Sequence, residues 1–185
     1  MDIIHAQGNA VGSLYDDAPH SQEIHGIPVY NTENILISGP MIISIGSNNI
    51  RKIISERYDV EYATAIHPES IVSPSATIGN GSVVMQNAII QADAKIGQHC
   101  IVNSGASIDH ECKIEDFVHI SPHATLCGNV HVGEGSWIGA GAIIIPGIKI
   151  GRWCTIGAGS VVIRDIPDGA TAYGNPAKVV RSIPE

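Results

Sequence analysis

Three adjacent residues near the middle of the sequence carry side chains suited to acid–base chemistry. Asp109, His110 and Glu111 stand in a row inside the segment IDHECK. An imidazole titrates near pH 6.5, so at neutral pH His110 can remove a proton from an attacking amine or hydroxyl group. A neighbouring carboxylate can fix its tautomer and raise its basicity, and the sequence alone does not choose between Asp109 and Glu111. The simpler interpretation is a solvated turn at the surface.

The triplet lies inside a repeat with a period of six residues. Every sixth residue from Ile66 to Val162 is Ile, Val or Leu, without a break in register. The position four residues after each of these is mostly small, from Ser70 to Ile166. This period is too short for a helical repeat unit and fits a strand, a turn and another strand. Three such sides predict a triangular parallel β-helix with coils of about 18 residues, stacked about 4.8 Å apart.

Stacking of the coils predicts which residues lie above one another. Residues 18 apart share a column, so His110 is followed by Gly128 and then by Pro146. Ile108 and Cys112 keep the repeat, one in the interior and one near a corner, so the charged triplet falls on outward positions. Because Gly128 has no side chain, we expect room for a ligand beside His110 and an exposed N–H that could stabilise an oxyanion.

Several six-residue units of the repeat resemble those of the hexapeptide-repeat acyltransferases, among them IGNGSV, VGEGSW, IGAGAI and IGAGSV. The ending VVIRDIPDGATAYGNPAKVVR is similar to the terminal segment of that family. The resemblance covers residues 66–185 and implies a left-handed parallel β-helix, a homotrimer, and acetyl-CoA as the donor. It also favours Glu111 as the partner of His110, since similar proteins carry a His-Glu pair in this place.

The resemblance further implies residues that bind the donor. His119 matches a histidine that contacts donor or acceptor in the family. It lies half a coil from His110, so a second subunit would have to bring its own copy near. The thioester would rest beside Gly128, and the column of Ala140 and Ala158, which matches backbone contacts on a neighbouring subunit, would let the pantetheine arm lie against the wall. Basic residues near the C-terminus could meet the CoA phosphates, namely Arg164, Lys178 and Arg181.

The first 60 or so residues follow a different pattern. The run from Met41 to Ile45 predicts a strand, and the segment after Gly46 predicts a helix, as in one nucleotide-binding β-α unit. Upstream, VGSLYDDAPH predicts a strand that ends in Asp16 and Asp17, and EIHGIPVYNTENI predicts a loop and a short helix. We therefore expect a partial Rossmann-like layer over residues 1–62.

This domain, placed before such a β-helix, resembles the sugar O- and N-acetyltransferase subfamily. Its members include UDP-amino-sugar N-acetyltransferases and sialic-acid O-acetyltransferase homologues, whose first domain holds the nucleotide part of the acceptor. The matching positions are Asp16, Asp17, Gly46 and Asn48. Members normally open with a strand and a glycine-rich loop, where this chain has MDIIHAQGNAVG. Either the acceptor is not a nucleotide sugar or the chain begins late relative to these proteins; the domain's alternative role is to cap the β-helix.

Composition and charge narrow the functional classes. The formal net charge of −8 argues against general attraction to nucleic acid or to an anionic membrane. No apolar run approaches the roughly 20 residues of a membrane span, and the N-terminus lacks the features of a signal peptide, so we expect a cytoplasmic protein. No two histidines of the repeat share a column, and the cysteines match no zinc spacing, so we expect no metal site. Three cysteines occupy small positions of the repeat, where packing explains them: Cys100, Cys112 and Cys154.

These expectations define a mainly β protein with three parts. Residues 1–62 form a partial α/β acceptor-binding domain, residues 63–167 the left-handed β-helix, and residues 168–185 a closing segment. The resemblance implies acetyl transfer from acetyl-CoA to an amino group of a UDP-linked amino-deoxy sugar, with His110 as the general base. The alternatives are O-acetylation of a sialic-acid-like sugar and a non-catalytic β-helix that serves as a scaffold.

Overall fold

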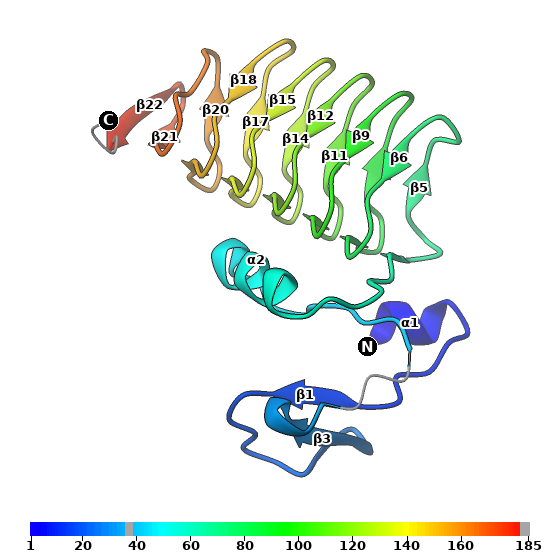
Figure 1. The fold of residues 1–185 in the computed structure, drawn as a ribbon. Coiled ribbons are helices and arrows are strands. Elements are labelled where there is room, and N and C mark those ends of the chain that lie inside the picture. The colour runs from blue at the N-terminus through cyan, green and yellow to red at the C-terminus, as the bar shows by residue number, and fades with distance from the viewer. Residues whose placement is uncertain (36–38, 182–185) are drawn as a thin grey trace.

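The computed structural model describes residues 1–35 and 39–181, and its body is a parallel β-helix with three flat sides (Figure 1). The first sheet contains β4 (Ala65–Ile66), β7 (Val83–Val84), β10 (Ile101–Val102), β13 (His119–Ile120), β16 (Trp137–Ile138) and β19 (Thr155–Ile156). The second sheet contains β5 (Ile71–Val72), β8 (Ile89–Ile90), β11 (Ser107–Ile108), β14 (Thr125–Leu126), β17 (Ile143–Ile144) and β20 (Val161–Val162). The third sheet contains β6 (Thr77–Ile78), β9 (Lys95–Ile96), β12 (Lys113–Ile114), β15 (His131–Val132) and β18 (Lys149–Ile150).

The pairing register confirms the coil length that the repeat predicts. Ser107 pairs with Thr125 and Ile108 with Leu126, so each residue lies beside the one a full coil further on. The second residue of each central strand points inward, and Ile108 and Leu126 are fully buried. The small positions are buried as well, Cys112 among them, so both halves of the repeat fill the interior.

The corners of the β-helix use a left-handed backbone conformation that the sequence analysis did not foresee. Residues with positive φ recur at six-residue intervals, and several are not glycine, including His99 (53°), Glu111 (59°) and Phe117 (60°). Each is held by a hydrogen bond to the coil before it, as where the Glu111 N–H donates to the Ala92 carbonyl at 3.0 Å. The tightly stacked coil therefore imposes a conformation that non-glycine residues seldom adopt.

The cysteines at small positions combine packing with a hydrogen bond. The thiols of Cys100, Cys112 and Cys154 donate to corner carbonyls of the next coil, at 3.1, 3.2 and 3.0 Å. Ser82 and Ser136 make the same bond with their hydroxyl groups. All four cysteines are free thiols. The small position thus holds either an apolar side chain or a short donor for a corner carbonyl of the next coil.

An antiparallel hairpin closes the C-terminal end of the β-helix. It consists of β21 (Thr171–Gly174) and β22 (Ala177–Arg181). β21 pairs in parallel with β19 and so continues the first sheet beyond the last coil.

The N-terminal third differs from the Rossmann-like layer that we expected. It contains α1 (Asp2–Ala6), β1 (Leu14–Asp16), β2 (Glu23–Ile24), β3 (Ile27–Asn31), a 3-10 turn (Thr32–Asn34) and α2 (Asn48–Arg57). The strand that ends at Asp16 and the helix after Gly46 are confirmed. β1 pairs in parallel with β3, and β2 pairs with β3 in antiparallel fashion, which makes a small mixed sheet.

Two predictions for this third were wrong. The run from Met41 to Ile45 is not a strand; only Met41 makes a bridge, to Tyr62, because the carbonyls of Ile45 and Gly46 bind Arg51 instead of a neighbouring strand. The segment EIHGIPVYNTENI, expected as a loop and a short helix, begins with the hairpin of β2 and β3 in place of the loop, and its short helix is the 3-10 helix Thr32–Asn34. His25 and Gly26 both have positive φ there, the conformation of a two-residue hairpin turn.

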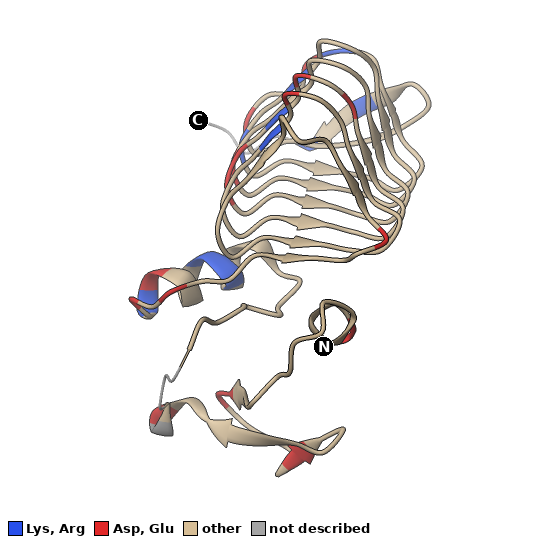
Figure 2. Cartoon of the chain, turned by 90° about the vertical axis from the view of Figure 1, so that its right-hand side faces the viewer, with Lys and Arg blue, Asp and Glu red and all other residues tan. Residues whose placement is uncertain are grey.

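The three sides of the β-helix carry different outward residues. In β4–β20 the charged strand residues are Lys95, Lys113 and Lys149, and all belong to the third sheet. From β4 to β20, the strands of the other two sheets carry no Lys, Arg, Asp or Glu, and most strands in Figure 2 are accordingly tan. In residues 1–35 and 39–181, no helix has the length and hydrophobicity needed to cross a membrane.

Candidate active site

His110 and Glu111 form a pair on the turn between β11 and β12, at the corner between the second and third sheets. His110 Nδ1 lies 3.1 Å from Glu111 Oε2, and both side chains are more than half exposed. Asp109 has another role, since its Oδ1 accepts the backbone N–H of His110 at 2.8 Å. The two carboxylates that the sequence left open are thereby distinguished: Glu111 contacts the imidazole and Asp109 fixes the turn.

The His110 ring lies directly over Gly128 on the next coil. A Cβ atom added to Gly128 would lie 2.6 Å from both Nε2 and Cε1 of His110, too close for any side chain. The ring itself therefore takes the space in which we expected a ligand. Gly128 is buried under this ring, and within residues 1–35 and 39–181 its N–H donates to no acceptor.

His119 lies on β13 in the first sheet, away from His110. Its Nε2 lies 3.2 Å from Asn103 Nδ2, and its ring stacks parallel to Trp137 at 5.8 Å between centroids. Burial lowers the pKa of His119 to about 4, assisted by the positive charge of Arg51 and opposed by a backbone hydrogen bond with Gly46. His119 is therefore neutral at physiological pH.

Gly46 and Asn48 stand at the start of α2, which lies against the first sheet. They border a pocket of about 370 Å³ together with Trp137 and Trp153. The amide of Asn48 is already engaged, since Oδ1 accepts from Arg51 at 2.8 Å and Nδ2 donates to the Gly135 carbonyl at 3.0 Å. Asn48 therefore shapes this pocket while its side chain holds α2 to the β-helix.

The two aspartates lie at the end of β1 in the small N-terminal sheet. Asp16 Oδ1 accepts the N–H of Ala18 at 2.8 Å. Asp17 Oδ1 accepts the hydroxyl of Thr32 at 2.6 Å, and its Oδ2 lies 3.7 Å from Arg57 Nη1 on α2. Asp17 thus ties the end of β1 to α2, and Asp16 caps the following turn.

Ala140 and Ala158 follow β16 and β19 at the corner between the first and second sheets. Both are exposed, and the Gly159 N–H donates to the Ala140 carbonyl at 2.8 Å, so the two alanines lie on consecutive turns. The predicted residues thus occupy four regions of one chain, represented by His110, by His119 with Gly46, by Ala140, and by Asp16 with Asp17. A single chain does not bring these regions together.

Two residues of this arrangement, Arg51 and Trp137, were not predicted. They lie in the helix expected after Gly46 and in the segment VGEGSW, but nothing in those letters showed that Arg51 is buried against the β-helix or that Trp137 lines a pocket with Gly46. In the part of the chain that the structure describes, no three His, Cys, Asp or Glu side chains are grouped as a metal site would need.

Comparison with known sequences supports the interpretation of the repeat. The family described as "Bacterial transferase hexapeptide (six repeats)" matches residues 75–110 and 129–164. UDP-N-acetylbacillosamine N-acetyltransferase of Bacillus subtilis (strain 168) is 53% identical over 47 residues. That stretch spans 24% of this chain and only 22% of the relative.

Solved structures match nearly the whole chain. The acetyltransferase domain of PglB from Neisseria gonorrhoeae FA1090 is 40% identical, covers 97% of this chain and 92% of its own, and has a TM-score of 0.91. A histidine-to-asparagine variant of perosamine N-acetyltransferase from Caulobacter crescentus, in complex with CoA and GDP-perosamine, is 34% identical, covers 98% and 90%, and also has a TM-score of 0.91. These matches confirm the predicted fold class, a left-handed parallel β-helix.

Proposed function

We propose that this chain, a member of the hexapeptide-repeat acyltransferases of the sugar-acetyltransferase type, is an acetyl-CoA-dependent N-acetyltransferase. It transfers the acetyl group to an amino group of a nucleotide-linked amino-deoxy sugar. The observation that carries the proposal is the His110–Glu111 pair placed against Gly128, whose N–H donates to no acceptor among the described residues. The names of the relatives support the donor and the amino group. A second PglB structure contains acetyl-CoA, and the curated relative and the perosamine enzyme are both N-acetyltransferases.

The geometry supports a direct transfer. Glu111 accepts the Nδ1–H of His110, which leaves Nε2 free to take a proton from the sugar amine as its nitrogen attacks the thioester carbonyl carbon. The carbonyl oxygen becomes an oxyanion, and the Gly128 N–H donates to it. When the tetrahedral intermediate collapses, the carbon–sulfur bond breaks and the CoA thiolate takes the proton from the imidazolium. General base catalysis of this kind contributes roughly 10²–10⁴ to the rate.

A homotrimer would complete this site. The outward residues of the second sheet are uncharged: Ile71, Ile89, Ser107, Thr125, Ile143 and Val161. Ile71 is 65% and Ile143 42% exposed in the single chain, an apolar stripe that a neighbouring copy would cover. Packing along this sheet would bring the His110 corner of one copy beside the Ala140 and Ala158 corner of the next.

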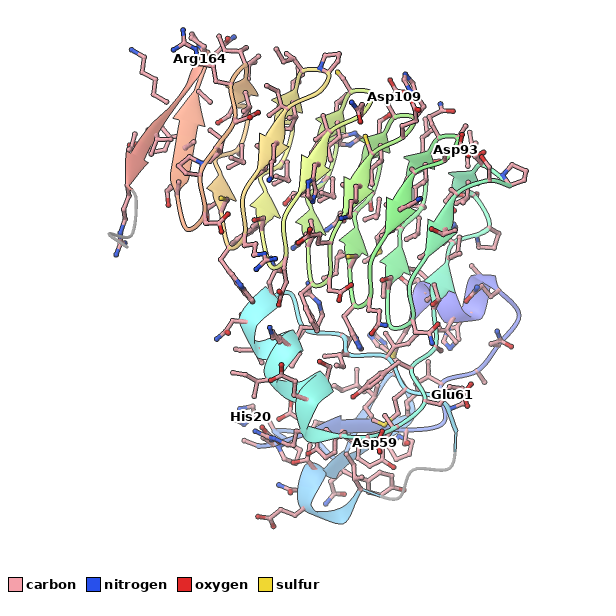
Figure 3. The ribbon with its side chains drawn as sticks, turned by 45° about the horizontal axis from the view of Figure 1, so that its top comes forward. His20, Asp59, Glu61, Asp93, Asp109 and Arg164 are labelled. Carbon is pink, nitrogen blue, oxygen red and sulfur yellow. The ribbon has the colours of Figure 1, made fainter. Side chains whose placement is uncertain are left out.

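Acetyl-CoA would then lie along the corner that carries His110. The column of His110 continues through Gly128 and Pro146. Arg164 lies at the corresponding corner of the last turn, which is two residues shorter because Ile150 bridges to Ile166, and Figure 3 shows Asp109 and Arg164 on the same upper edge. Three coils of about 4.8 Å separate His110 from Arg164, about 14 Å in all. The extended pantetheine arm has a similar length, so Arg164 would meet the CoA phosphates while the acetyl group lies at His110.

The acceptor would lie where α2 meets the first sheet, between Gly46 and Trp137. For its nucleotide we propose UDP, as in the name of the curated relative, although the bound sugar of the perosamine enzyme carries GDP. For transfer to occur, the acceptor bound in this pocket of one copy must place its sugar amine at His110 of a neighbouring copy.

A panel of acceptors tests this function. The protein is mixed with acetyl-CoA and UDP- or GDP-linked amino sugars, free thiol release is followed, and the product is identified by mass spectrometry. We expect release with an amino sugar, fastest with a UDP-linked one, and none with the same nucleotide sugar bearing a hydroxyl in place of the amine. Thiol release with the hydroxyl sugar alone would indicate O-acetylation. No release with any acceptor would support the alternative that the protein is a non-catalytic scaffold.

A further inference from the structure

Arg51 of α2 is a buried cation without an anionic partner. Only 1% of the residue is exposed, and it takes part in no ion pair within residues 1–35 and 39–181. Its burial lowers the guanidinium pKa to about 10. An unpaired buried charge is costly unless its donors are satisfied, so Arg51 needs an explanation beyond helix packing.

The guanidinium group satisfies its donors with neutral oxygens from two parts of the chain. On one side, Nη1 donates to the carbonyls of Ile45 (3.0 Å) and Gly46 (3.3 Å), and Nη2 to Oδ1 of Asn48 (2.8 Å). On the other side, Nε donates to the His99 carbonyl at 2.7 Å and Nη2 to the Phe117 carbonyl at 2.9 Å. Arg51 therefore binds the loop before α2 and the wall of the β-helix at once.

The carbonyls on the wall belong to a single column. His99, Phe117 and Gly135 are 18 residues apart, and all three have positive φ at the corner between the third and first sheets. Arg51 takes the carbonyls of the first two, and Asn48 takes that of Gly135 at 3.0 Å. The start of α2 is thus held in register with three consecutive coils.

We propose that Arg51 is a positioning residue for the acceptor site, which fixes Gly46 and Asn48 on the β-helix. The proposal rests on the proposed function, and a titration of the neighbouring His119 gives a readout that does not depend on activity. Gly46 contacts His119 and lines the pocket with Trp137, so a displaced loop would change both.

The surroundings of His119 explain why its titration reports on Arg51. They are Asn103 and Trp137 from the first sheet and Gly46 and Arg51 from the N-terminal third. Arg51 is the charged member of this set, and its cation disfavours a second positive charge nearby. It acts in the same direction on His99, whose pKa is lowered first by burial and then by Arg51.

The experiment compares Arg51→Met, Arg51→Lys and the control Lys52→Met. The His119 titration is followed by NMR of histidine-labelled protein, and KM is measured for acceptor and for acetyl-CoA. In Arg51→Met we expect the His119 midpoint to rise by about 1 pH unit and the acceptor KM by about tenfold or more, with the acetyl-CoA KM unchanged. Arg51→Lys keeps the charge without the planar fork, so the midpoint stays low while the acceptor KM still rises.

Lys52→Met removes a positive charge from the same helix but leaves the guanidinium contacts, so neither quantity should change. Should Arg51→Met lower the melting temperature yet leave the His119 midpoint and the acceptor KM as in the wild type, Arg51 is merely structural and the proposal fails. If Arg51→Met does not fold, an unchanged acceptor KM in Arg51→Lys overturns the positioning role. If the wild type shows no acetyl transfer, the proposed function fails, while the titration still decides the effect on His119.

Discussion

At the scale of single residues, Asp109, His110 and Glu111 have different roles that the sequence alone did not assign. Glu111 contacts the imidazole of His110, and Asp109 holds the backbone of the turn. The sequence predicted that the triplet points outward and lies beside Gly128, because both follow from the period of the repeat. It could not assign the two carboxylates, since that depends on how the left-handed conformation of Glu111 turns its side chain.

The close approach of His110 to Gly128 predicts a strong coupling between them. In Gly128→Ala the new methyl group would displace the imidazole, so we expect kcat to fall by roughly 10²-fold or more through loss of base catalysis. Thermal unfolding of the double-mutant cycle is the check: Gly128→Ala should cost stability in the wild type and much less in His110→Ala, where the ring is gone. Equal costs in both backgrounds would contradict the contact.

The lowered pKa of His119 predicts a dependence of stability on pH. The folded chain holds His119 with a pKa of about 4, whereas the unfolded chain returns it to about 6.5. Between these values the unfolded chain binds more protons, so the free energy of unfolding falls as pH decreases, by on the order of 3 kcal/mol for this residue. Urea unfolding at pH 7 and pH 4.5 should show a smaller decrease in His119→Gln; an equal decrease would refute this assignment.

At the scale of elements, the corners of the β-helix are stabilised by short donors at the small positions. The repeat predicted that Cys154 packs at a corner, and its burial confirms this. Its hydrogen bond to the Pro167 carbonyl could not be predicted, because the acceptor lies on the next coil and depends on the corner geometry.

These side-chain hydrogen bonds predict that the stability of a corner depends on the hydrogen-bond donor more than on the sulfur atom. Cys154→Ala leaves the Pro167 carbonyl with only the bond from the Ala170 N–H at 3.3 Å and should lower the free energy of unfolding by about 0.5–1.5 kcal/mol. Cys154→Ser keeps a donor, as Ser136 shows one coil earlier, and should cost clearly less. Denaturant unfolding of the two variants decides; a serine variant as unstable as the alanine variant would argue against the hydrogen bond.

The N-terminal third shows where prediction from single segments fails. The helix after Gly46 follows from its own pattern and is present, but the strand from Met41 to Ile45 needed a partner that the described residues do not supply beyond Tyr62. The hairpin of β2 and β3 was missed because His25 takes a left-handed conformation more typical of Asn or Gly. These elements depend on tertiary pairing, whereas each coil of the β-helix is specified again every 18 residues.

At the scale of the whole molecule, the three sides predict which surface another copy covers. Sedimentation velocity should show a trimer for the wild type. Ile143→Lys places a charge on the apolar stripe of the second sheet and should yield monomers with at least about tenfold lower activity, since the shared donor groove is lost. The matched control Thr77→Lys, on the third sheet beside Lys95, should remain trimeric and active. A trimer that persists in Ile143→Lys would contradict the shared cleft.

The central claim is that His110 is the base for acetyl transfer, and one kinetic comparison tests it most directly. Thiol release from acetyl-CoA is measured with the best amino-sugar acceptor for the wild type and for His110→Ala, with unfolding curves to show that both are folded. We predict that kcat falls by about 10²–10⁴-fold in His110→Ala. Thiol release at the wild-type rate by the folded His110→Ala variant would contradict the account.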